Sequence, residues 1–437
     1  MPDQHPPLST PAAGPGSPDA LGGLMGYLDR SPTPWHAALN ASLLLEEAGF
    51  ERRDPGDDLG GVTSGFVRRG GSLVAWRGLP DEPFRAIGAH TDSPGFRLRP
   101  RATTTSADMT RLAVEPYGGL LLNSWLDRDL TLAGRIALRD PGSATGRSLR
   151  LFHHQGPILR IPQLAIHLDR EVNEGLKLDR QHHVQPLWAS GELGEEAFVE
   201  FLASELDVEP SSVLAWEAQL ADTLPAARIG RACEFLASAR LDDLCCCYGA
   251  IRALASAGGG GRPAVVVLND HEEVGSTSAT GALGLWLAQL LERLVLDNGG
   301  TRGDLLAALA GSELLSADMA HGTHPNYPER HEPTHPVALG SGPVIKHNVN
   351  QRYATEASTA AAFRDACSSA SVPVQDYSHR GDLPCGSTIG PLTAAGLSID
   401  TLDVGMAQLS MHSAREVMAC DDVGFMCDAF AAWFTAA

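Results

Sequence analysis

Lysine is nearly absent from this chain of 437 residues. Only Lys177 and Lys346 are lysines among 33 basic residues, against 53 acidic ones, and the formal net charge is −20. Binding nucleic acid irrespective of sequence needs a basic face that neutralises phosphates, so the composition argues against that class of protein. No segment approaches the ~18 consecutive apolar residues of a membrane-spanning helix, which argues against a membrane protein.

Paired or patterned cysteines are also lacking. The eight cysteines show neither the spacing of a zinc finger nor the density of a disulfide-rich secreted domain. Cys245, Cys246 and Cys247 are consecutive, and we interpret them as small buried residues in a reducing compartment. The first 20 residues have neither the basic start nor the apolar stretch of a secretory signal. We therefore expect a disordered lead-in over residues 1–20 of a cytoplasmic protein.

Hydrophobic patterning separates an N-terminal part from a middle part. The apolar spacing over residues 21–50 predicts two helices, and apolar segments at 71–79 and 84–90 predict strands. From residue 101 to 234 short strand-like segments alternate with Gly and Pro turns, with one helical stretch at 195–206. The middle part is therefore predicted to be a separate β-rich lobe.

From residue 235 to the end, helical and strand-like patterns alternate. The continuous β-branched run at 263–270 is typical of a strand that is buried on both faces of a parallel sheet. The sequence thus predicts an α/β protein with a mixed, mostly parallel sheet flanked by helices. Residues 21–100 and 235–437 would form this domain, with the β-rich lobe inserted at 101–234.

Ionisable side chains cluster where predicted strands end. The clusters are His90-Thr91-Asp92, Asp270-His271-Glu272-Glu273, Asp318-Met319-Ala320-His321 and Met411-His412-Ser413, and Asp242-Asp243 opens a predicted helix. Ligands of open α/β sheets gather at the carboxyl ends of strands. A single cluster of this kind is more often a capping or surface group. Together, carboxylates and imidazoles without thiolates are typical of a hydrolytic pair of zinc or manganese ions.

Two local arrangements support such a site. Glu272 and Glu273 are adjacent, so their side chains diverge, and one can ligate a metal while the other acts as a general base. Asp92 lies two residues after His90, where its carboxylate can orient the imidazole.

Seven segments stand in the order seen in the aspartyl aminopeptidase family of dizinc metallopeptidases, which the chain resembles from about Leu21 to its end. They are AHTDSPGFRLRP, SARLDD, DHEEVGS, SADMAHGTHPNYPERHEP, GPVIKHNVNQRYAT, LPCGSTIGP and MHSAREVM. The resemblance implies an enzyme that releases N-terminal Asp or Glu from peptides. It also implies a zinc exopeptidase-like catalytic domain interrupted by a dimerisation lobe, with dimers assembling into a homo-oligomeric dodecamer.

The resemblance further implies a set of metal ligands. His90 and Asp318 would bind one ion, Glu273 and His412 the other, and Asp242 would bridge the two. The implied cofactors are two divalent ions per subunit, zinc in the first place, with manganese and cobalt as alternatives.

Two carboxylates would then serve catalysis. Glu272 would be the general base that deprotonates the attacking water, and Asp92 would hold His90. Asp243 stands where the family more often has Asn, and His271 stands where Asn or a related residue is more usual. Neither difference removes an implied ligand.

Substrate-binding residues are less sharply defined. A pocket for an acidic side chain needs a cation, and GPVIKHNVNQRYAT offers Lys346, His347 and Arg352. Lys346 interests us most because the chain uses arginine at almost every other basic position; the alternative is an exposed, solvated lysine. Tyr353 either hydrogen-bonds the tetrahedral intermediate or fills a strand face. His167 either reaches the active site of a neighbouring subunit or packs at the interface.

Two alternative activities would fit the same predicted fold and metal site. An aminopeptidase of broader or neutral specificity, or a dizinc deacylase, could use the same scaffold. A catalytically silent scaffold is disfavoured, because every implied ligand and the base are present.

Overall fold

The computed structural model describes residues 18–258 and 261–436, which form two compact units. The first unit comprises the described residues up to Asp92, Ala226–Met411 and those from Glu416 onward. The second comprises Ser93–Pro225 and His412–Arg415. The first unit contains two sheets and the second unit contains one.

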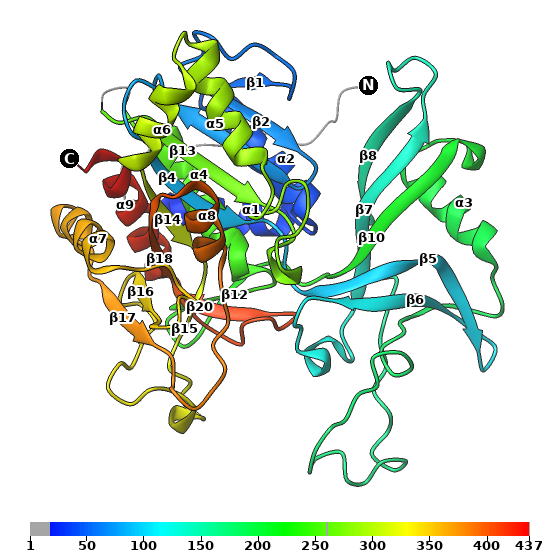
Figure 1. Ribbon diagram of the computed structural model, residues 1–437. Coiled ribbons are helices and arrows are strands. Elements are labelled where there is room, and N and C mark those ends of the chain that lie inside the picture. Colours follow the sequence, from blue (N-terminus) through cyan, green and yellow to red (C-terminus); the bar gives the residue numbers. More distant parts are fainter. Residues whose placement is uncertain (1–17, 259–260, 437) are drawn as a thin grey trace. The chain divides into compact units, whose positions relative to one another are not determined.

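Helices flank a mixed sheet in the first unit (Figure 1). The helices are α1 (Pro18–Arg30), α2 (Pro34–Glu47), α4 (Leu241–Ser256), α5 (Trp286–Asp297), α6 (Arg302–Ala310), α7 (Ala357–Ser369), α8 (Ile389–Leu397) and α9 (Asp421–Thr435). The strands of the main sheet lie in the order β1 (Glu51–Arg53), β2 (Ser64–Arg69), β3 (Ser72–Arg77), β13 (Ala264–Asn269), β4 (Arg85–His90), β14 (Glu313–Ala317), β18 (Asp400–Gly405), β16 (Val344–His347) and β17 (Gln375–Ser378).

The centre of this sheet is parallel. Strands β13, β4, β14 and β18 run in the same direction, whereas β3 and β16 pair with the two sides of this group in antiparallel fashion. The predicted α/β fold with a mixed, mostly parallel sheet is thereby confirmed. A smaller sheet of the same unit has the order β11 (Ala227–Ile229), β12 (Phe235–Ser238), β20 (Glu416–Ala419), β19 (Ala407–Leu409) and β15 (Ala320–His321).

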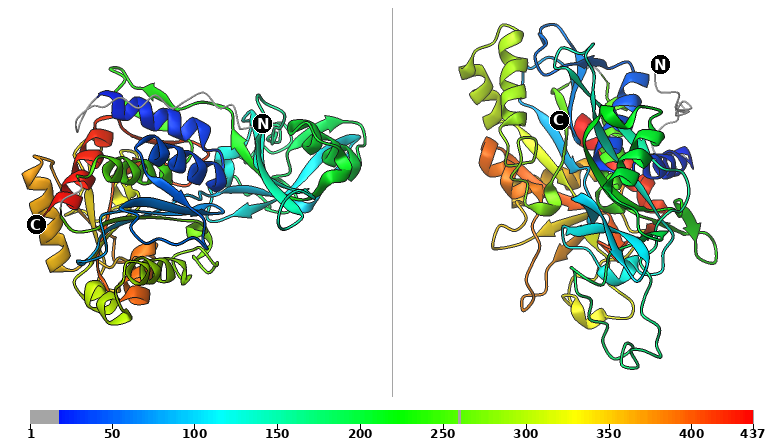
Figure 2. Two further views of the ribbon diagram at one scale, coloured as in Figure 1. Left: turned by 90° about the horizontal axis from the view of Figure 1, so that it is seen from above. Right: turned by 90° about the vertical axis from the view of Figure 1, so that its right-hand side faces the viewer.

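Alternate residues of the central strands enter two different cores. In β13, Val266 and Leu268 pack into a core that α1, α2, α4, α7 and α9 share. Val265 and Val267 pack into a second core with α5 and α6. Figure 2 shows helices on both faces of this sheet. Because both faces are covered, the strand is apolar from Ala264 to Leu268, as its sequence predicted.

The second unit has an antiparallel sheet and one α-helix. Its strands lie in the order β8 (Arg147–His153), β7 (Leu130–Arg139), β10 (Val213–Asp222), β5 (Gly95–Ser106), β6 (Met109–Tyr117) and β9 (Leu187–Ser190). Helix α3 (Glu195–Glu205) coincides with the helical stretch predicted at 195–206, and its Phe198 is fully buried in the core of this unit. The β-rich character expected of the middle part is present.

The edges of the units differ from the expected insertion at 101–234. Strand β5 runs unbroken from Gly95 to Ser106, so the change in sequence texture near residue 101 falls inside a strand. At the other edge, β11 lies within the expected insertion but belongs to the smaller sheet of the first unit, whereas β12 begins at residue 235 as expected. Of the predicted lead-in, residues 1–17 lie outside the described residues, and residues 18–20 begin α1.

Two expectations from composition can be compared with the structure. Cys245, Cys246 and Cys247 lie in α4 with side chains fully shielded from solvent, and all eight cysteines are free thiols, as interpreted from the sequence. Over the described residues, none of the helices has the length and apolar character needed to cross a membrane.

Candidate metal centre

Parallel strands bring the predicted site residues to one edge of the main sheet. His90 is the last residue of β4, and Asp318 directly follows β14. Glu272 and Glu273 begin the short 3-10 helix η3 (Glu272–Val274), which follows β13. Because β13, β4 and β14 are parallel neighbours, their carboxyl ends meet. Segments that are far apart in the sequence therefore converge.

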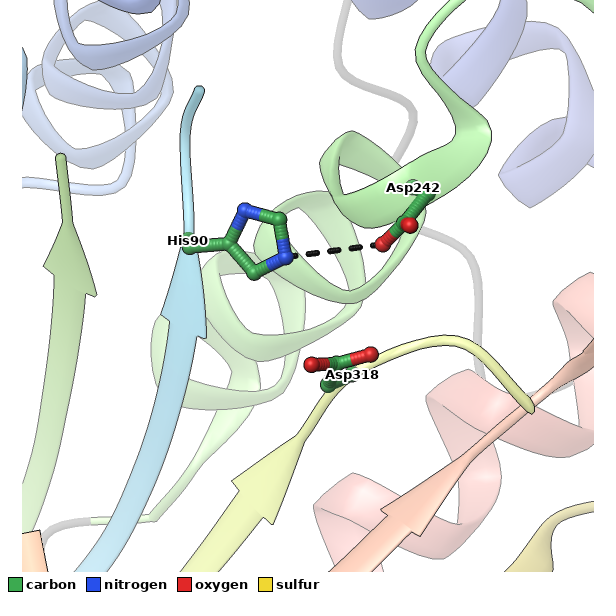
Figure 3. A group of neighbouring side chains, drawn as sticks. All are labelled: His90, Asp242 and Asp318. Carbon is green, nitrogen blue, oxygen red and sulfur yellow. Dashed lines mark ion pairs between the residues drawn. The ribbon is translucent and has the colours of Figure 1, made fainter. Parts of the chain in front are cut away.

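The side chains at this edge form two overlapping groups. His90, Asp242 and Asp318 each offer a ligand atom within 4.8 Å of the other two, and all three are buried. The Nε2 atom of His90 lies 3.4 Å from Oδ1 of Asp242 (Figure 3). His90, Glu272 and Glu273 satisfy the same distance limit. His90 belongs to both groups, so its imidazole can share an ion with the two aspartates or with the two glutamates.

An irregular start of α4 presents Asp242 and Asp243. The peptide bond between them is cis, and both have backbone angles outside the helical range. The backbone N–H of Asp242 donates to Oε2 of Glu416 at 3.0 Å, and Oδ2 of Asp243 accepts the backbone N–H of His90 at 3.1 Å. These two bonds tie the beginning of α4 to β20 and to the end of β4.

Asp92 contacts both His90 and the glutamate pair. The Nδ1 atom of His90 lies 3.0 Å from the backbone oxygen of Asp92 and 3.6 Å from its Oδ1. The same carboxylate accepts the backbone N–H groups of Glu272 at 3.0 Å and Glu273 at 3.1 Å. Asp92 therefore lies beside the imidazole, as expected, and also anchors the turn that carries the two glutamates.

The closely spaced carboxylates change the pKa values of Glu272 and His90. Burial raises the pKa of Glu272 to about 7, the charge of His90 opposes this rise, and the charges of Asp318, Asp92 and Asp242 add to it. Burial lowers the pKa of His90, but bonds to Asp242 and Asp92 raise it more, to well above its usual value. Negative charges are thus gathered where water is scarce, an arrangement that a divalent cation would stabilise. Oxygen and imidazole donors suit zinc, so the residues fit a zinc site.

Lys346 is buried beside one of the predicted ligands. Its side chain is 3% exposed, and its Nζ lies 3.1 Å from Oδ1 of Asp318. The alternative of an exposed, solvated lysine is therefore wrong. His347 pairs with Asp376 at 2.8 Å, and Arg352 is exposed, so Lys346 is the buried one of the three candidate cations.

Tyr353 lies between β16 and α7 and belongs to no strand, so it does not fill a strand face. Its side chain is buried, and Lys346 Nζ lies 5.5 Å from the centre of its ring. The contact is within the range of a cation–π interaction.

A comparison with protein families identifies the family of this chain. The profile described as "Aminopeptidase I zinc metalloprotease (M18)" matches residues 27–434. The chain belongs to the M18 family of zinc aminopeptidases. The family predicted from the sequence segments is thereby confirmed, and the protein is a zinc metalloaminopeptidase and hence a hydrolase.

Relatives and solved structures cover nearly the whole chain. A protein of Streptomyces coelicolor, named "Probable M18 family aminopeptidase 2", is 46% identical over an alignment of 423 residues, and the match covers 94% of this chain and 96% of the relative. The structure of the Ape4 and Nbr1 complex aligns with TM-score 0.90 and 33% identity, covering 95% of this chain and 85% of that chain. The S. cerevisiae mApe1 dodecamer aligns with TM-score 0.81 and 26% identity, covering 95% and 96%.

Two residues implied for this M18 aminopeptidase belong to the second unit. The Nδ1 atom of His412 lies 3.0 Å from the backbone oxygen of Gly119, and His167 is exposed on a loop. The roles that the resemblance implies for them remain predictions.

Two carboxylates of the M18 site make contacts that their positions in the sequence did not predict. Asp243 was noted only as a departure from the family pattern, yet it holds the backbone of His90. Glu416 holds the backbone of Asp242. Its position four residues after His412, in the segment MHSAREVM, is the signal that could have suggested it.

Proposed function

We propose that this M18 zinc aminopeptidase removes Asp or Glu from the N-terminus of peptides at a site that holds two zinc ions. The observation that carries the acidic specificity is the buried Lys346, whose ammonium lies 3.1 Å from the predicted ligand Asp318. A compact, fixed cation beside the reacting centre is suited to receive the carboxylate of an acidic first residue.

The proposed ligands follow the family resemblance. His90 and Asp318 would hold one ion, Glu273 and His412 the other, and Asp242 would bridge them. The proximity of His90, Asp242 and Asp318 supports the first set, and that of His90, Glu272 and Glu273 supports placing a second ion nearby. Manganese and cobalt ions accept the same donors, so they are the alternatives to zinc.

Zinc ions, when bound, would lower the pKa of the attacking water and polarise the scissile carbonyl. Glu272 acts as the general base: it takes the proton from water as the water attacks, and then passes that proton to the leaving amine. Asp92 fixes the Glu272 backbone by accepting its N–H, so the carboxylate is presented from a held turn. Tyr353 packs against Lys346 and limits where its ammonium can move.

The same resemblance leads us to propose a homo-oligomer. The solved S. cerevisiae relative is a dodecamer. We propose that dimers form through the second unit, that they assemble into a dodecamer, and that His167 reaches the active site of a neighbouring subunit. We also propose a cytoplasmic location, because the eight free cysteines fit a reducing compartment.

A panel of peptides tests the proposed specificity. Purified protein is assayed on matched peptides that begin with Asp, Glu or Leu, with and without added zinc, manganese or cobalt. We expect cleavage of the Asp and Glu peptides; a preference for Leu over both would reject the acidic pocket and favour a neutral aminopeptidase.

Replacing the buried lysine tests the residue that carries the proposal. Lys346→Ala should raise KM for Asp peptides about 10- to 100-fold, as the loss of one charge-assisted contact predicts, and change KM for Leu peptides far less. Lys177→Ala is the matched control, because Lys177 is the chain's other lysine and is exposed in the second unit. An equal loss on every peptide would remove Lys346 from the pocket.

A further inference from the structure

Asp403 is a buried carboxylate within the main sheet that the proposed chemistry does not use. It lies in β18, and its side chain is fully shielded from solvent. The hydroxyl of Ser316 donates to its Oδ1 at 2.7 Å, and the hydroxyl of Thr388 donates to the same atom at 2.5 Å. The backbone N–H of Ala354 donates to its Oδ2 at 2.6 Å. A single side chain thus gathers three donors from three separate segments.

Those three segments carry or adjoin the residues of the site. Ser316 lies in β14, two residues before Asp318, and Ala354 directly follows Tyr353. Thr388 caps α8, and its hydroxyl accepts the backbone N–H of Gly390, so its own hydrogen is left to donate to Asp403. A carboxylate that only accepts is the form that this set of donors stabilises.

Sheet register brings Asp403 next to Lys346. Strands β16 and β18 are antiparallel, with Val344 opposite Gly405 and Ile345 opposite Val404. The next position of that register sets Lys346 across from Asp403. Burial raises the pKa of Asp403, and the charge of Lys346 is the largest opposing influence, so the two charges act on each other. Opposite charges on facing strand positions stabilise the pair.

Close packing leaves Asp403 little freedom to move. A side-chain carbon added to Gly390 would collide with both carboxylate oxygens of Asp403. The carboxylate therefore lies against the first turn of α8, where the helix dipole favours a negative charge. The position of the carboxylate is therefore fixed by two hydroxyl groups, one backbone N–H group, the start of α8 and the charge of Lys346.

We propose that Asp403 is the positioning residue of the specificity pocket, which holds Lys346 and the Tyr353–Ala354 turn in place beside Asp318. Its carboxylate bonds to the strand that leads to Asp318, to the turn that carries Tyr353, and to the cap of α8. Over the described part of the chain, the hydrogen bonds of this carboxylate reach neither a predicted metal ligand nor the general base. Its effect on the reaction would therefore pass through Lys346.

This proposal rests on the proposed function, because it takes Lys346 as the cation that receives an acidic side chain. The carboxylate of Asp318 is proposed to be a zinc ligand. Asp403 is then the carboxylate that remains to face the Lys346 ammonium. Without it, a buried cation would lack a facing anion next to a cationic centre, and its position would change.

Asp403→Asn tests the charge with little loss of shape. An Asn oxygen still accepts the Ala354 N–H, and the Ser316 hydroxyl can rotate to accept from the new amide, while the negative charge facing Lys346 is gone. The control is Asp422→Asn in α9. Asp422 is also fully buried and accepts two backbone N–H groups, from Gly340 at 2.7 Å and Gly342 at 2.9 Å.

The experiment is a double-mutant cycle between Asp403→Asn and Lys346→Met. KM and kcat are measured on an Asp peptide and a Leu peptide, and thermal unfolding is measured on the zinc-free proteins. We expect Asp403→Asn to raise KM for the Asp peptide about tenfold with little change in kcat. In the Lys346→Met background it should leave KM for the Asp peptide unchanged and should lower the unfolding temperature less than it does in the wild type, because the charge pair is already absent. Asp422→Asn should lower the unfolding temperature and leave both KM values unchanged.

Independent, additive effects of the two substitutions would overturn the proposal. So would a fall in unfolding temperature for Asp403→Asn with unchanged KM, since that is the behaviour of the control. If Asp403→Asn does not fold, Ser316→Ala removes one donor and leaves the charge, and it should raise KM in the same direction by a smaller factor. If the wild type prefers Leu peptides, the proposed function fails, and the zinc-free unfolding cycle still decides whether Asp403 acts through Lys346.

Discussion

Replacing Asp92 by Asn separates the geometry of the site from its metal ligands. Asp92 is fully buried, and its two carboxylate oxygens accept the N–H groups of Glu272 and Glu273. An Asn side chain has one accepting oxygen, so one of these N–H groups would face an amide that also donates. The substitution therefore breaks one anchor of the turn that carries the proposed base.

The size of the effect follows from that lost bond. A hydrogen bond to a charged group contributes about 1.5–3 kcal/mol, and a buried N–H without an acceptor costs a similar amount. About 1.4 kcal/mol corresponds to tenfold in an equilibrium or a rate, so we expect kcat/KM to fall about 10- to 100-fold. Zinc affinity should fall as well, because Asp92 also faces the ring of His90 at 3.6 Å.

The assay needs a measure of activity, a measure of metal binding and a measure of stability. Steady-state kinetics on an Asp peptide, zinc competition with a chromogenic chelator and urea unfolding of the zinc-free protein supply them. Asp422→Asn is the matched control, since it loses the same kind of carboxylate with two backbone donors outside the proposed site. If Asp92→Asn matches the control, with reduced stability and unchanged kinetics and zinc affinity, then Asp92 has only a structural role.

Two further predictions concern the base and a buried acid. Glu272→Gln should lower kcat by about 10²–10⁴ with zinc content unchanged by elemental analysis, because the amide cannot take the proton from water; an unchanged kcat would remove Glu272 from the chemistry. Burial raises the pKa of Asp422 to about 6 from 3.8. The protonated Asp422 carboxyl stabilises the folded state fully below pH 3.8, and this stabilisation of about 3 kcal/mol is lost as the pH rises through 6. Urea unfolding should therefore show that the free energy of unfolding of the wild type rises relative to that of Asp422→Asn as the pH falls from 7 to 4. A difference between the two proteins that does not change with pH would refute the raised pKa.

Strand ends could be predicted from the sequence because a local signal marks them. The apolar segments before His90, Asp270 and Asp318 stop at charged residues, and the three corresponding strands do lie parallel in one sheet. The order of those strands was not predictable, because it depends on which faces the helices cover. Helices α6 and α8 were missed for a related reason: each is a short helix of nine residues whose formation depends on packing.

The sequence did not predict which polar residues are buried. The sequence left open whether Lys346 is exposed, since a strand of four residues gives too short a pattern to tell its two faces apart. Asp403 interrupts an apolar strand in SIDTLDVG, and a charged residue at such a position was the available signal that its partners would be special. Identifying those partners required the fold, because Ser316, Ala354 and Thr388 come from three other segments.

The burial of Lys346 has a physical basis in the shape of a lysine side chain. Arginine carries a planar fork of donors that needs several acceptors in fixed directions, whereas lysine carries a compact charge at the end of a flexible stem. Lys346 lies beside Asp318, and the β16–β18 register extended by one position places it across from Asp403, where one small cation can serve both carboxylates. On the proposed ligand set zinc would claim Asp318, and Asp403 would still face the ammonium. A lysine flanked by two carboxylates therefore remains paired in the zinc-free and the zinc-bound protein, and this explains how a buried charge can persist beside a cationic centre.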